Sequence, residues 1–213
     1  MAYPLVLDVA TGTGRVLDAL LQEDFRGQLV GLDLSRGMLD RARSNLLTGR
    51  DQVQLLWQDA SHLPFDDESF DAVTCLESLE FFPNPLEALS EMVRVLAPGG
   101  VLFVTNRVGP EARWLPGRAI PRRRFKEILS RYSMCDVQVR PWQMDYDLAV
   151  AYKDGDLDPM GHGNGNSASM VRCPDCGGPL RSENSSFVCR ACARAYLLRD
   201  GIICLASFDT VNS

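Results

Sequence analysis

Short apolar runs alternate with amphipathic segments along most of the chain. Each run has the length of a strand, and the segments between them space their apolar residues as a helix does. The runs are residues 5–9, a run ending at Asp33, a run ending near Trp57, residues 70–75 and residues 101–106. Strands that alternate with helices in this way form a parallel sheet. The pattern therefore predicts an α/β fold with helices on both faces of that sheet.

Capping residues mark where the expected helices begin. Ser35 is expected to cap one helix, and Asn84 followed by Pro85 is a strong start signal for another. The second helix is expected to end before Pro98 and to turn these residues inward: Leu86, Leu89, Met92, Val93 and Leu96. A further helix is expected over residues 122–132, and residues 135–143 and 145–152 can pair as a closing hairpin.

A change in composition divides the chain. Residues 153–169 are rich in Gly, Asn, Asp and Ser and show no apolar periodicity, which is typical of a flexible linker. We therefore expect a first domain at residues 1–152 and a second, small domain at residues 170–208. At 213 residues the chain is long enough for one medium domain and a small one.

Charge and hydropathy limit the possible environments. The net charge of −6 does not favour overall attraction to nucleic acid. No apolar run approaches the roughly 20 residues of a membrane helix, so no membrane insertion is expected. The N-terminus has no basic segment followed by a cleavage site, and a cytoplasmic protein is the default expectation.

The first candidate binding motif is residues 5–15, LVLDVATGTGR. A strand, a glycine-rich turn and a helix form a nucleoside-binding unit, in which an acidic residue about 20 positions after the glycines binds ribose hydroxyls. Asp33 lies 33 − 14 = 19 residues after Gly14 and ends the next apolar run. Leu17 occupies the place of the third glycine of the dinucleotide motif. The pattern therefore favours a nucleoside ligand over a dinucleotide.

Five motifs in register carry a family resemblance: DVATGTG, GLDLSRGML, QDASHLPF, SFDAVTCLESLEFFPNP and RVLAPGGVLFVTN. Over roughly residues 4–152 the chain resembles the class I S-adenosylmethionine-dependent methyltransferases, and most of all the ubiquinone/menaquinone-biosynthesis enzymes. The resemblance implies a Rossmann-like methyltransferase sheet. The chain departs from the family pattern at Ala10, where many relatives have glycine, and at the N-terminus, where relatives usually carry a helical segment before the first strand.

The resemblance also implies roles for single residues. The methionine half of S-adenosylmethionine would lie against Asp8, Ala10, Gly12 and Gly14, and Asp33 would bind both ribose hydroxyls. The adenine would contact Leu34 and Met38, with Asp59 accepting from its amino group and the Ala60 backbone facing the ring. Most single aspartates are turn or capping residues. Three of them that each follow an apolar run in the expected order are poorly explained in that way.

Four cysteines after the linker have the spacing of a metal site. Two C-x₂-C pairs, Cys173 with Cys176 and Cys189 with Cys192, are separated by 12 residues. Four thiolates close the coordination shell of Zn²⁺ and leave no position for water, so we expect a structural zinc ribbon. Without a secretion signal, two disulfides are a weaker explanation. The segment resembles the zinc-ribbon activator subunit of tRNA, rRNA and release-factor methyltransferases, but has Leu197 and Ile203 where that family usually has proline.

The other three cysteines and the candidate general bases do not define a functional site. Cys75 and Cys135 lie in apolar runs and are expected to be buried, and Cys204 is a packing residue or, less convincingly, an alternative metal ligand. A general base is needed only where the acceptor must lose a proton. Candidates are Glu77, Glu80 and His62, but the sequence assigns none of them, so the catalytic residue stays unknown.

A basic segment and an absent motif bear on the acceptor. Nine Arg and Lys residues fall between positions 107 and 140, and Arg122, Arg123 and Arg124 could contact RNA or another anionic partner. A solvated helix face is the simpler explanation. CLESLEFF replaces the Asn/Asp-Pro-Pro-Tyr/Phe motif of nucleic-acid and glutamine N-methyltransferases, which disfavours that chemistry.

Three functions remain open. The favoured one is methyl transfer from S-adenosylmethionine to a small-molecule acceptor. A second is an RNA or translation-factor methyltransferase with a built-in zinc-ribbon activator, whose partner could also bind the ribbon. The third is a non-catalytic cofactor-binding scaffold, which the first strand's start close to Met1 suggests. In the first two cases, a partner chain could supply the cover that the N-terminal segment gives in relatives.

Overall fold

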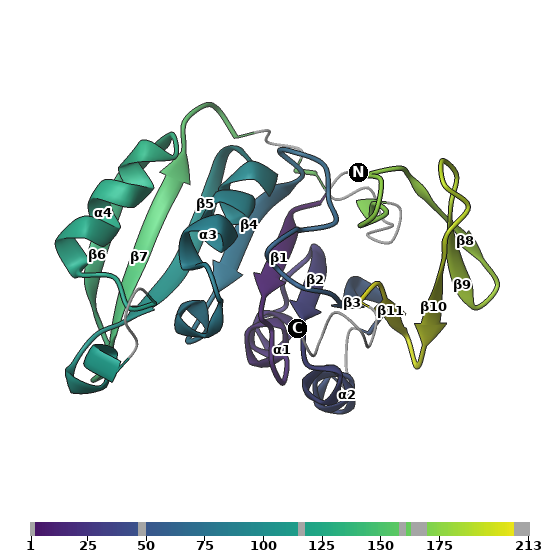
Figure 1. Cartoon of the computed structure of the whole chain (residues 1–213), viewed down its shortest axis with the longest axis horizontal. Coiled ribbons are helices and arrows are strands. Elements are labelled where there is room, and N and C mark those ends of the chain that lie inside the picture. Colours follow the sequence, from purple (N-terminus) through teal and green to yellow (C-terminus); the bar gives the residue numbers. More distant parts are fainter. Residues whose placement is uncertain (1–2, 47–49, 115–117, 158–160, 163–169, 207–213) are drawn as a thin grey trace.

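The computed structural model describes residues 3–46, 50–114, 118–157, 161–162 and 170–206. The strands of the described residues form one eleven-stranded sheet in the order β6-β7-β5-β4-β1-β2-β3-β11-β10-β9-β8 (Figure 1). The larger part contains β1 (Leu5–Val9), β2 (Gln28–Asp33), β3 (Val53–Trp57), β4 (Phe70–Cys75), β5 (Leu96–Arg107), β6 (Met134–Trp142) and β7 (Tyr146–Lys153). The smaller part contains β8 (Leu180–Glu183), β9 (Ser186–Cys189), β10 (Ala195–Arg199) and β11 (Ile202–Cys204).

The predicted parallel sheet is confirmed. β3, β2, β1, β4 and β5 pair in parallel, and β7 joins β5 in antiparallel orientation. β6 pairs with β7 as the predicted closing hairpin. The carboxyl ends of the parallel strands therefore lie along one edge of the sheet. The β6–β7 turn lies at this same edge, because β7 begins opposite the end of β5.

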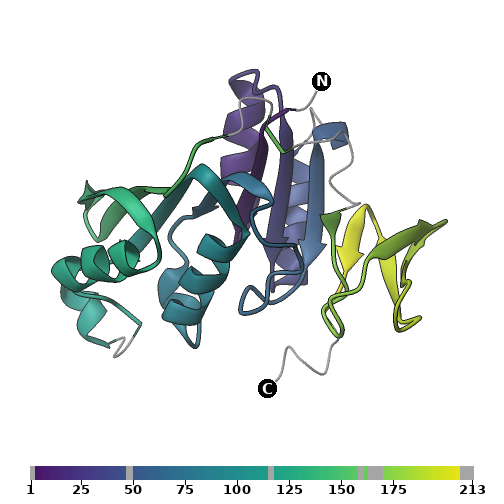
Figure 2. The same ribbon diagram turned by 90° about the horizontal axis from the view of Figure 1, so that it is seen from above.

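Helices cover both faces, as predicted. They are α1 (Arg15–Gln22), α2 (Arg36–Asn45), α3 (Pro85–Val95) and α4 (Arg122–Arg131), with 3₁₀ turns η1 (Arg50–Gln52), η2 (Leu79–Phe81) and η3 (Pro110–Trp114). Successive strand residues point to opposite faces. Val6 thus joins the buried cluster under α1 and α2, and its neighbour Leu7 joins the cluster under α3 and α4. Figure 2 shows these helices on either side of the sheet.

Both expected helix caps are present. The Ser35 side chain accepts from the Met38 N–H, and the Asn84 side chain accepts from the Glu87 N–H. Of the expected inward face of α3, Leu89, Met92 and Val93 are buried as predicted. Leu86 is 36% exposed because the helix turns it toward α4 rather than the sheet, and Leu96 is buried but begins β5 instead of belonging to the helix. None of the helices within the described residues is long and apolar enough to cross a bilayer.

The small C-terminal part extends the sheet of the larger part. β11 pairs in parallel with β3, with Ile202 opposite Leu55 and Ile203 opposite Leu56. Both isoleucines are fully buried, Ile202 in the α1/α2 cluster and Ile203 in the α3/α4 cluster. One sheet and a shared core therefore join the two parts.

The segment between the two parts is only partly described, because residues 158–160 and 163–169 of the expected linker lie outside the described residues. Its described part contacts the amino-terminal edge of the sheet. The buried Asp71 carboxylate accepts from the backbone N–H of Leu5 and of His162, and its other oxygen lies 2.7 Å from His162 Nδ1. His162 therefore anchors one point of this segment.

Candidate functional site

Three aspartates lie where neighbouring parallel strands end. Asp8 is near the end of β1, Asp33 ends β2, and Asp59 follows β3 by two residues. Because β1, β2 and β3 are adjacent and parallel, these side chains lie along one edge of the sheet. Crevices at this edge are the usual ligand sites of open α/β sheets.

The glycine-rich turn between β1 and α1 has the backbone shape that its sequence predicts. Ala10, Gly12 and Gly14 all have positive φ angles, of 55°, 56° and 79°. A Cβ built on Gly12 would meet only the Ala10 carbonyl oxygen, at 4.0 Å. The space above Gly12 is therefore open, and a ligand can lie directly on the backbone there. Ala10 accepts a conformation that costs free energy for any residue with a side chain.

Asp33 connects this turn to the start of α2. Its Oδ2 accepts from the Gly12 N–H at 2.8 Å, and its Oδ1 accepts from the Ser35 N–H at 2.7 Å. Both bonds use backbone donors, so they fix the carboxylate without depending on neighbouring side chains. The end of β2 and the glycine turn are thereby held as one unit.

Asp8 lies under the same turn and is buried. It accepts hydrogen bonds from the hydroxyls of Thr11, at 2.6 Å, and Thr74, at 2.5 Å. Burial outweighs these bonds and raises the pKa of Asp8 to about 6, with a further contribution from the charge of Asp33. Asp8 therefore changes its charge within one pH unit or so of neutrality. Sequence reasoning placed Asp8 in the site but missed its two threonine partners.

The expected adenine contacts surround the ends of β2 and β3. Leu34 and Met38 are 40% and 38% exposed, so their apolar surfaces are available to a ring. The Trp57 indole donates to the Leu34 carbonyl at 2.8 Å and joins the two strand ends. Asp59 is half-buried, with Oδ1 accepting from the Ser61 N–H, and Ala60 is buried beside it.

A second polar cluster lies beyond the end of β4, on the other side of the glycine turn. Glu80 in η2 is 1% exposed, and its Oε1 accepts from the Tyr146 hydroxyl at 2.6 Å. The Arg107 guanidinium donates to the same hydroxyl at 3.0 Å. Burial and then the bond to Glu80 raise the pKa of Tyr146 to about 12, so its hydroxyl stays a donor.

One atom of this cluster is unsatisfied. Oε2 of Glu80 is buried and has no hydrogen-bond partner in the described part of the chain. Such an orphaned oxygen is costly and is uncommon in native structures. Glu77, the neighbouring candidate, instead accepts from Gln143, and His62 is exposed. Glu80 is thus the candidate base with an available, desolvated acceptor atom. The sequence could not single it out, because Arg107 and Tyr146 come from distant strands.

The four ribbon cysteines converge. Their sulfur atoms all lie within 4.8 Å of one another, with Cys173 3.7 Å from Cys192 and Cys176 3.5 Å from Cys189. Four sulfurs at the Zn–S distance of about 2.3 Å are about 3.8 Å apart in a tetrahedron. The donor set therefore fits Zn²⁺. The four thiols interact with one another: the backbone N–H of Cys192 lowers the pKa of the Cys189 thiol to about 6, whereas the hydrogen bonds with its sulfur neighbours raise the pKa of Cys176.

The other three cysteines differ from one another. Cys75 is buried as predicted, and burial raises the pKa of its thiol well above the usual range. Cys135 is exposed, so the prediction of a buried packing residue is wrong. β6 is an edge strand with one face toward solvent, and Cys135 lies on that face. Cys204 packs in the α1/α2 cluster and accepts from Arg36, apart from the cluster of four.

The ribbon contacts the elements that carry the expected adenine contacts. The backbone N–H groups of Leu205 and Ala206 both donate to the Trp57 carbonyl, at 3.0 and 2.9 Å. Arg36, near the start of α2, donates to the Cys204 sulfur and the Arg199 carbonyl. A cavity of about 810 Å³ between the two parts is lined by both, with Trp57 and Asp59 on one wall and Tyr196 on the other. No motif in the sequence predicted this cavity.

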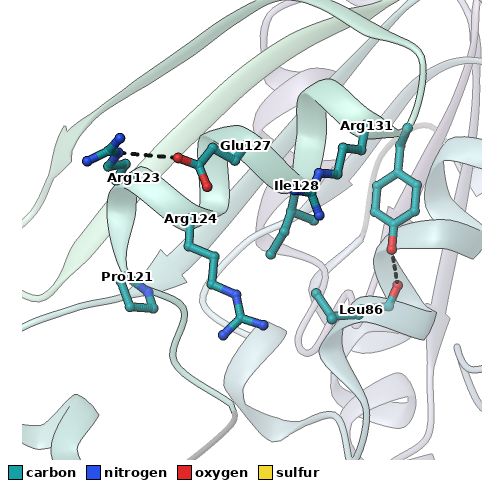
Figure 3. Close-up of a pocket in the computed structure, with 8 residues that line it drawn as sticks. Leu86, Pro121, Arg123, Arg124, Glu127, Ile128 and Arg131 are labelled. Carbon is teal, nitrogen blue, oxygen red and sulfur yellow. Dashed lines mark hydrogen bonds and ion pairs between the residues drawn. The ribbon is translucent and has the colours of Figure 1, made fainter.

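The basic residues of α4 are not equivalent. Arg122 binds the fully buried Asp147 through two nitrogen atoms, which fixes α4 to the start of β7. Arg123 is 94% exposed on its side chain and pairs with Glu127. Arg124 is also exposed and points into a groove between α3 and α4 (Figure 3). Of the three expected partner contacts, Arg122 is therefore occupied within the fold.

Two family models match the chain. The model described as "Methyltransferase domain" matches residues 7–104, which contain the three aspartates and the glycine turn. The model described as "Trm112p-like protein" matches residues 168–201, which contain the four cysteines. The two matches fall on the larger and the smaller part of the sheet.

Several curated proteins are similar to the chain. The demethylmenaquinone methyltransferase of Clavibacter sepedonicus is 42% identical over 99 residues, or 46% of this chain and 39% of that protein. The demethylmenaquinone methyltransferase of Lactiplantibacillus plantarum is 32% identical over 160 residues, or 70% of this chain and 68% of that protein. The chain spans about half or less of the length of several such relatives.

Solved structures share the fold at low identity. A chain from the complex that contains the Haloferax volcanii Trm112 methyltransferase activator has a TM-score of 0.59 at 22% identity, covering 74% of this chain and 85% of that one. A phosphoethanolamine N-methyltransferase of Haemonchus contortus, in complex with S-adenosylhomocysteine, has a TM-score of 0.60 at 17% identity, covering 72% and 49%. The [4+2]-cyclase SpnF reaches 0.60 at 23% identity, covering 73% and 77%, so the fold alone does not fix the reaction.

Proposed function

Because the chain belongs to the family of S-adenosylmethionine-dependent methyltransferases, we propose that it transfers a methyl group from S-adenosylmethionine to a small-molecule acceptor. The observation that carries this proposal is the joined unit of glycine turn and Asp33, with Gly12 N–H bound to the Asp33 carboxylate beneath an open backbone surface. The small-molecule assignment is supported by the demethylmenaquinone methyltransferases among the relatives.

In this proposal, different residues at the carboxyl edge of the sheet contact different parts of the cofactor. The methionine half would lie over Ala10, Gly12 and Gly14, with Asp8 beneath the turn. Asp33 accepts from the ribose hydroxyls in addition to its two backbone donors, since a carboxylate has about four acceptor positions. The adenine ring would contact Leu34 and Met38, with Asp59 accepting from its amino group and the Ala60 backbone facing the ring.

The reaction requires no covalent bond between the protein and the substrates. S-adenosylmethionine supplies a methyl group on a sulfonium, whose C–S bond breaks as the bond to the acceptor forms. The chain's residues must hold the acceptor in line with the methyl group, and such orientation can contribute roughly 7–11 kcal/mol. Where the acceptor carries a hydroxyl or an acidic C–H, its proton must also leave.

We assign to Glu80 the contact with the acidic proton of the methyl acceptor. Its Oε2 is buried and unpartnered, while Tyr146 and Arg107 fix its other oxygen. A desolvated carboxylate with one free oxygen accepts a hydrogen bond, and then the proton, of the acceptor. Removal of this carboxylate should therefore lower turnover while leaving cofactor binding intact.

The first experiment is calorimetric titration of the protein with S-adenosylmethionine and S-adenosylhomocysteine. Asp33→Ala should weaken binding at least tenfold, because it removes both the ribose acceptor and the anchor of the glycine turn. Asp51→Ala, at an exposed position in η1, is the matched control and should bind as the unaltered chain does. Equal binding by both variants would refute the assigned cofactor site.

The second experiment tests the reaction. Labelled S-adenosylmethionine is incubated with small-molecule acceptors that carry a hydroxyl beside an aromatic C–H, and methylated products are identified by mass spectrometry. Glu80→Gln should lower kcat tenfold or more, whereas Glu87→Gln, on the exposed start of α3, should not. Unchanged turnover by Glu80→Gln would remove Glu80 from the mechanism.

A second function is favoured by one observation. β11, which directly follows the residues that match the Trm112p-like model, extends the methyltransferase sheet at β3, so an activator-like module is attached within the same chain. This arrangement supports an RNA or translation-factor methyltransferase with a built-in activator. Label appearing in RNA or protein of a cell extract, but in no small molecule, would favour it. Cofactor binding without label in any fraction would favour the non-catalytic scaffold.

The ribbon cysteines would hold a structural Zn²⁺ under this proposal. Four sulfurs within 4.8 Å of one another leave no open position for a reacting group. Elemental analysis of purified protein should therefore give one zinc per chain. Cys189→Ser should lower this content and destabilise the ribbon, and a metal content of zero in folded protein would refute the assignment.

A further inference from the structure

α4 concentrates positive charge in an acidic chain. Residues 122–131 contain five Arg and Lys and one Glu, whereas the net charge of the whole chain is −6. Three arginines occupy the first turn, where the helix dipole is already positive, and Pro121 offers no side-chain cap. Helices ordinarily place acidic residues there. The arrangement opposes helix stability and attracts anions.

Part of this charge is not neutralised within the fold. Arg122 is bound to Asp147 and Arg123 to Glu127. Arg124, Lys126 and Arg131 have no acidic partner among the residues that the structure describes, and all three are exposed. These side chains remain available to a partner outside the chain.

A groove of about 610 Å³ runs between α3 and α4 beside these residues. Figure 3 shows Arg124 directed into the groove from α4, with Leu86 on the opposite side. Leu86, Pro121 and Ile128 give it an apolar lining, and the Tyr132 hydroxyl donates to the Leu86 carbonyl at one end. Apolar walls with arginines at the rim suit an amphipathic anion better than a nucleic-acid backbone, which presents only polar groups.

Large apolar side chains are exposed on the same edge of the molecule. Phe81 follows β4 and is 69% exposed, Trp114 follows β5 and is 84% exposed, and Met144 in the β6–β7 turn is 92% exposed. All three loops lie at the carboxyl edge of the sheet, where the first turn of α4 also begins (Figure 1). Neither the core nor the proposed cofactor contacts use these three side chains.

We propose that the first turn of α4, its groove with α3, and the loop residues Phe81, Trp114 and Met144 form a surface that docks on an anionic lipid bilayer. Basic residues beside exposed aromatic and aliphatic side chains are the combination that binds bilayer interfaces, since charge attracts the headgroups and apolar groups enter the acyl boundary. The docked edge is the one that carries Glu80 and the glycine turn. The surface itself does not depend on the proposed methyl transfer.

The test is sedimentation of the full zinc-loaded chain with vesicles of phosphatidylcholine alone and of equimolar phosphatidylcholine and phosphatidylglycerol. The chain should bind only the anionic vesicles. The double variant Arg123→Glu/Arg124→Glu should reduce that binding at least tenfold. The matched control reverses two exposed arginines away from this edge, Arg26→Glu/Arg41→Glu, and should retain binding. Circular dichroism and thermal unfolding of each variant verify that the fold is intact.

Trp114 provides an independent optical readout. Its fluorescence should shift to shorter wavelength on anionic vesicles, and Trp114→Phe should abolish the shift while sedimentation persists. Equal loss of binding in the control pair would show non-specific electrostatics and overturn the proposal. Absence of vesicle binding would also overturn the proposal. If the chain then binds single-stranded RNA in an Arg124-dependent way, the surface is assigned to nucleic acid.

Discussion

The shared core between the ribbon and the larger part can be tested at Ile203. This side chain belongs to β11, yet it is fully buried in the cluster that underlies α3 and α4, opposite Leu56 of β3. Truncation of a fully buried isoleucine to alanine costs about 2–5 kcal/mol, because both transfer free energy and packing are lost. For a chain of 213 residues each kcal/mol corresponds to roughly 2–4 °C in Tm, so Ile203→Ala should lower Tm by roughly 4–20 °C.

The assay is thermal unfolding of the zinc-loaded protein, followed by circular dichroism and by the fluorescence of Trp57, which lies in β3 next to the junction. Both signals should shift together, because β11 and β3 share backbone bonds and core. Leu197→Ala, at a 45% exposed position of β10, is the control and should change Tm by only a few degrees. A shift of the circular dichroism transition alone, with the Trp57 fluorescence transition unchanged, would show that the two parts do not share a core.

Three further predictions concern Asp8, the ribbon metal and Arg122. The pKa of Asp8 in the fold, about 6 against an ordinary 3.8, means that its contribution to stability is present below pH 3.8 and is lost as pH rises through 6, by roughly 3 kcal/mol. The ionised form attracts the cationic methionine half, so cofactor affinity should rise over the same pH window, and calorimetry of Asp8→Asn should show a flat profile. Chelation of the metal should unfold the ribbon and, through β11, lower the Tm of the larger part as well; a larger part that melts unchanged would contradict this. Arg122→Ala should lower Tm because it leaves Asp147 buried without its cation, whereas Arg123→Ala, at a surface pair, should not.

The candidate site was predictable where its geometry is local. Asp8, the glycine turn and Asp33 lie within one strand–turn–helix–strand unit, so their positions at the edge follow from the order of the elements along the chain. The cysteine spacing likewise brings four sulfurs together through two tight turns. Sequence reasoning could not select Glu80 over Glu77, because Tyr146 and Arg107, which distinguish it, approach from β7 and β5.

The errors have the same origin. Leu86 has the helical spacing of a core residue, but the path of α3 turns it toward the groove beside α4. Cys135 lies in an apolar run, but the run became an edge strand with a solvent-facing side. In both cases the pattern identified the element correctly, while the burial of one residue depended on which neighbour covered it.

The sequence by itself therefore determined the elements, the cysteine cluster and the order of the three aspartates, because hydrophobic period, glycine conformation and ligand spacing act over a few residues. Only the tertiary structure decided that β11 pairs with β3, that Arg122 forms an ion pair with Asp147, and that one oxygen of Glu80 has no partner among the described residues. Each of these depends on a pairing between segments far apart in the chain. Such pairings are set by the free energy of the whole packed sheet, to which any single segment contributes only a part.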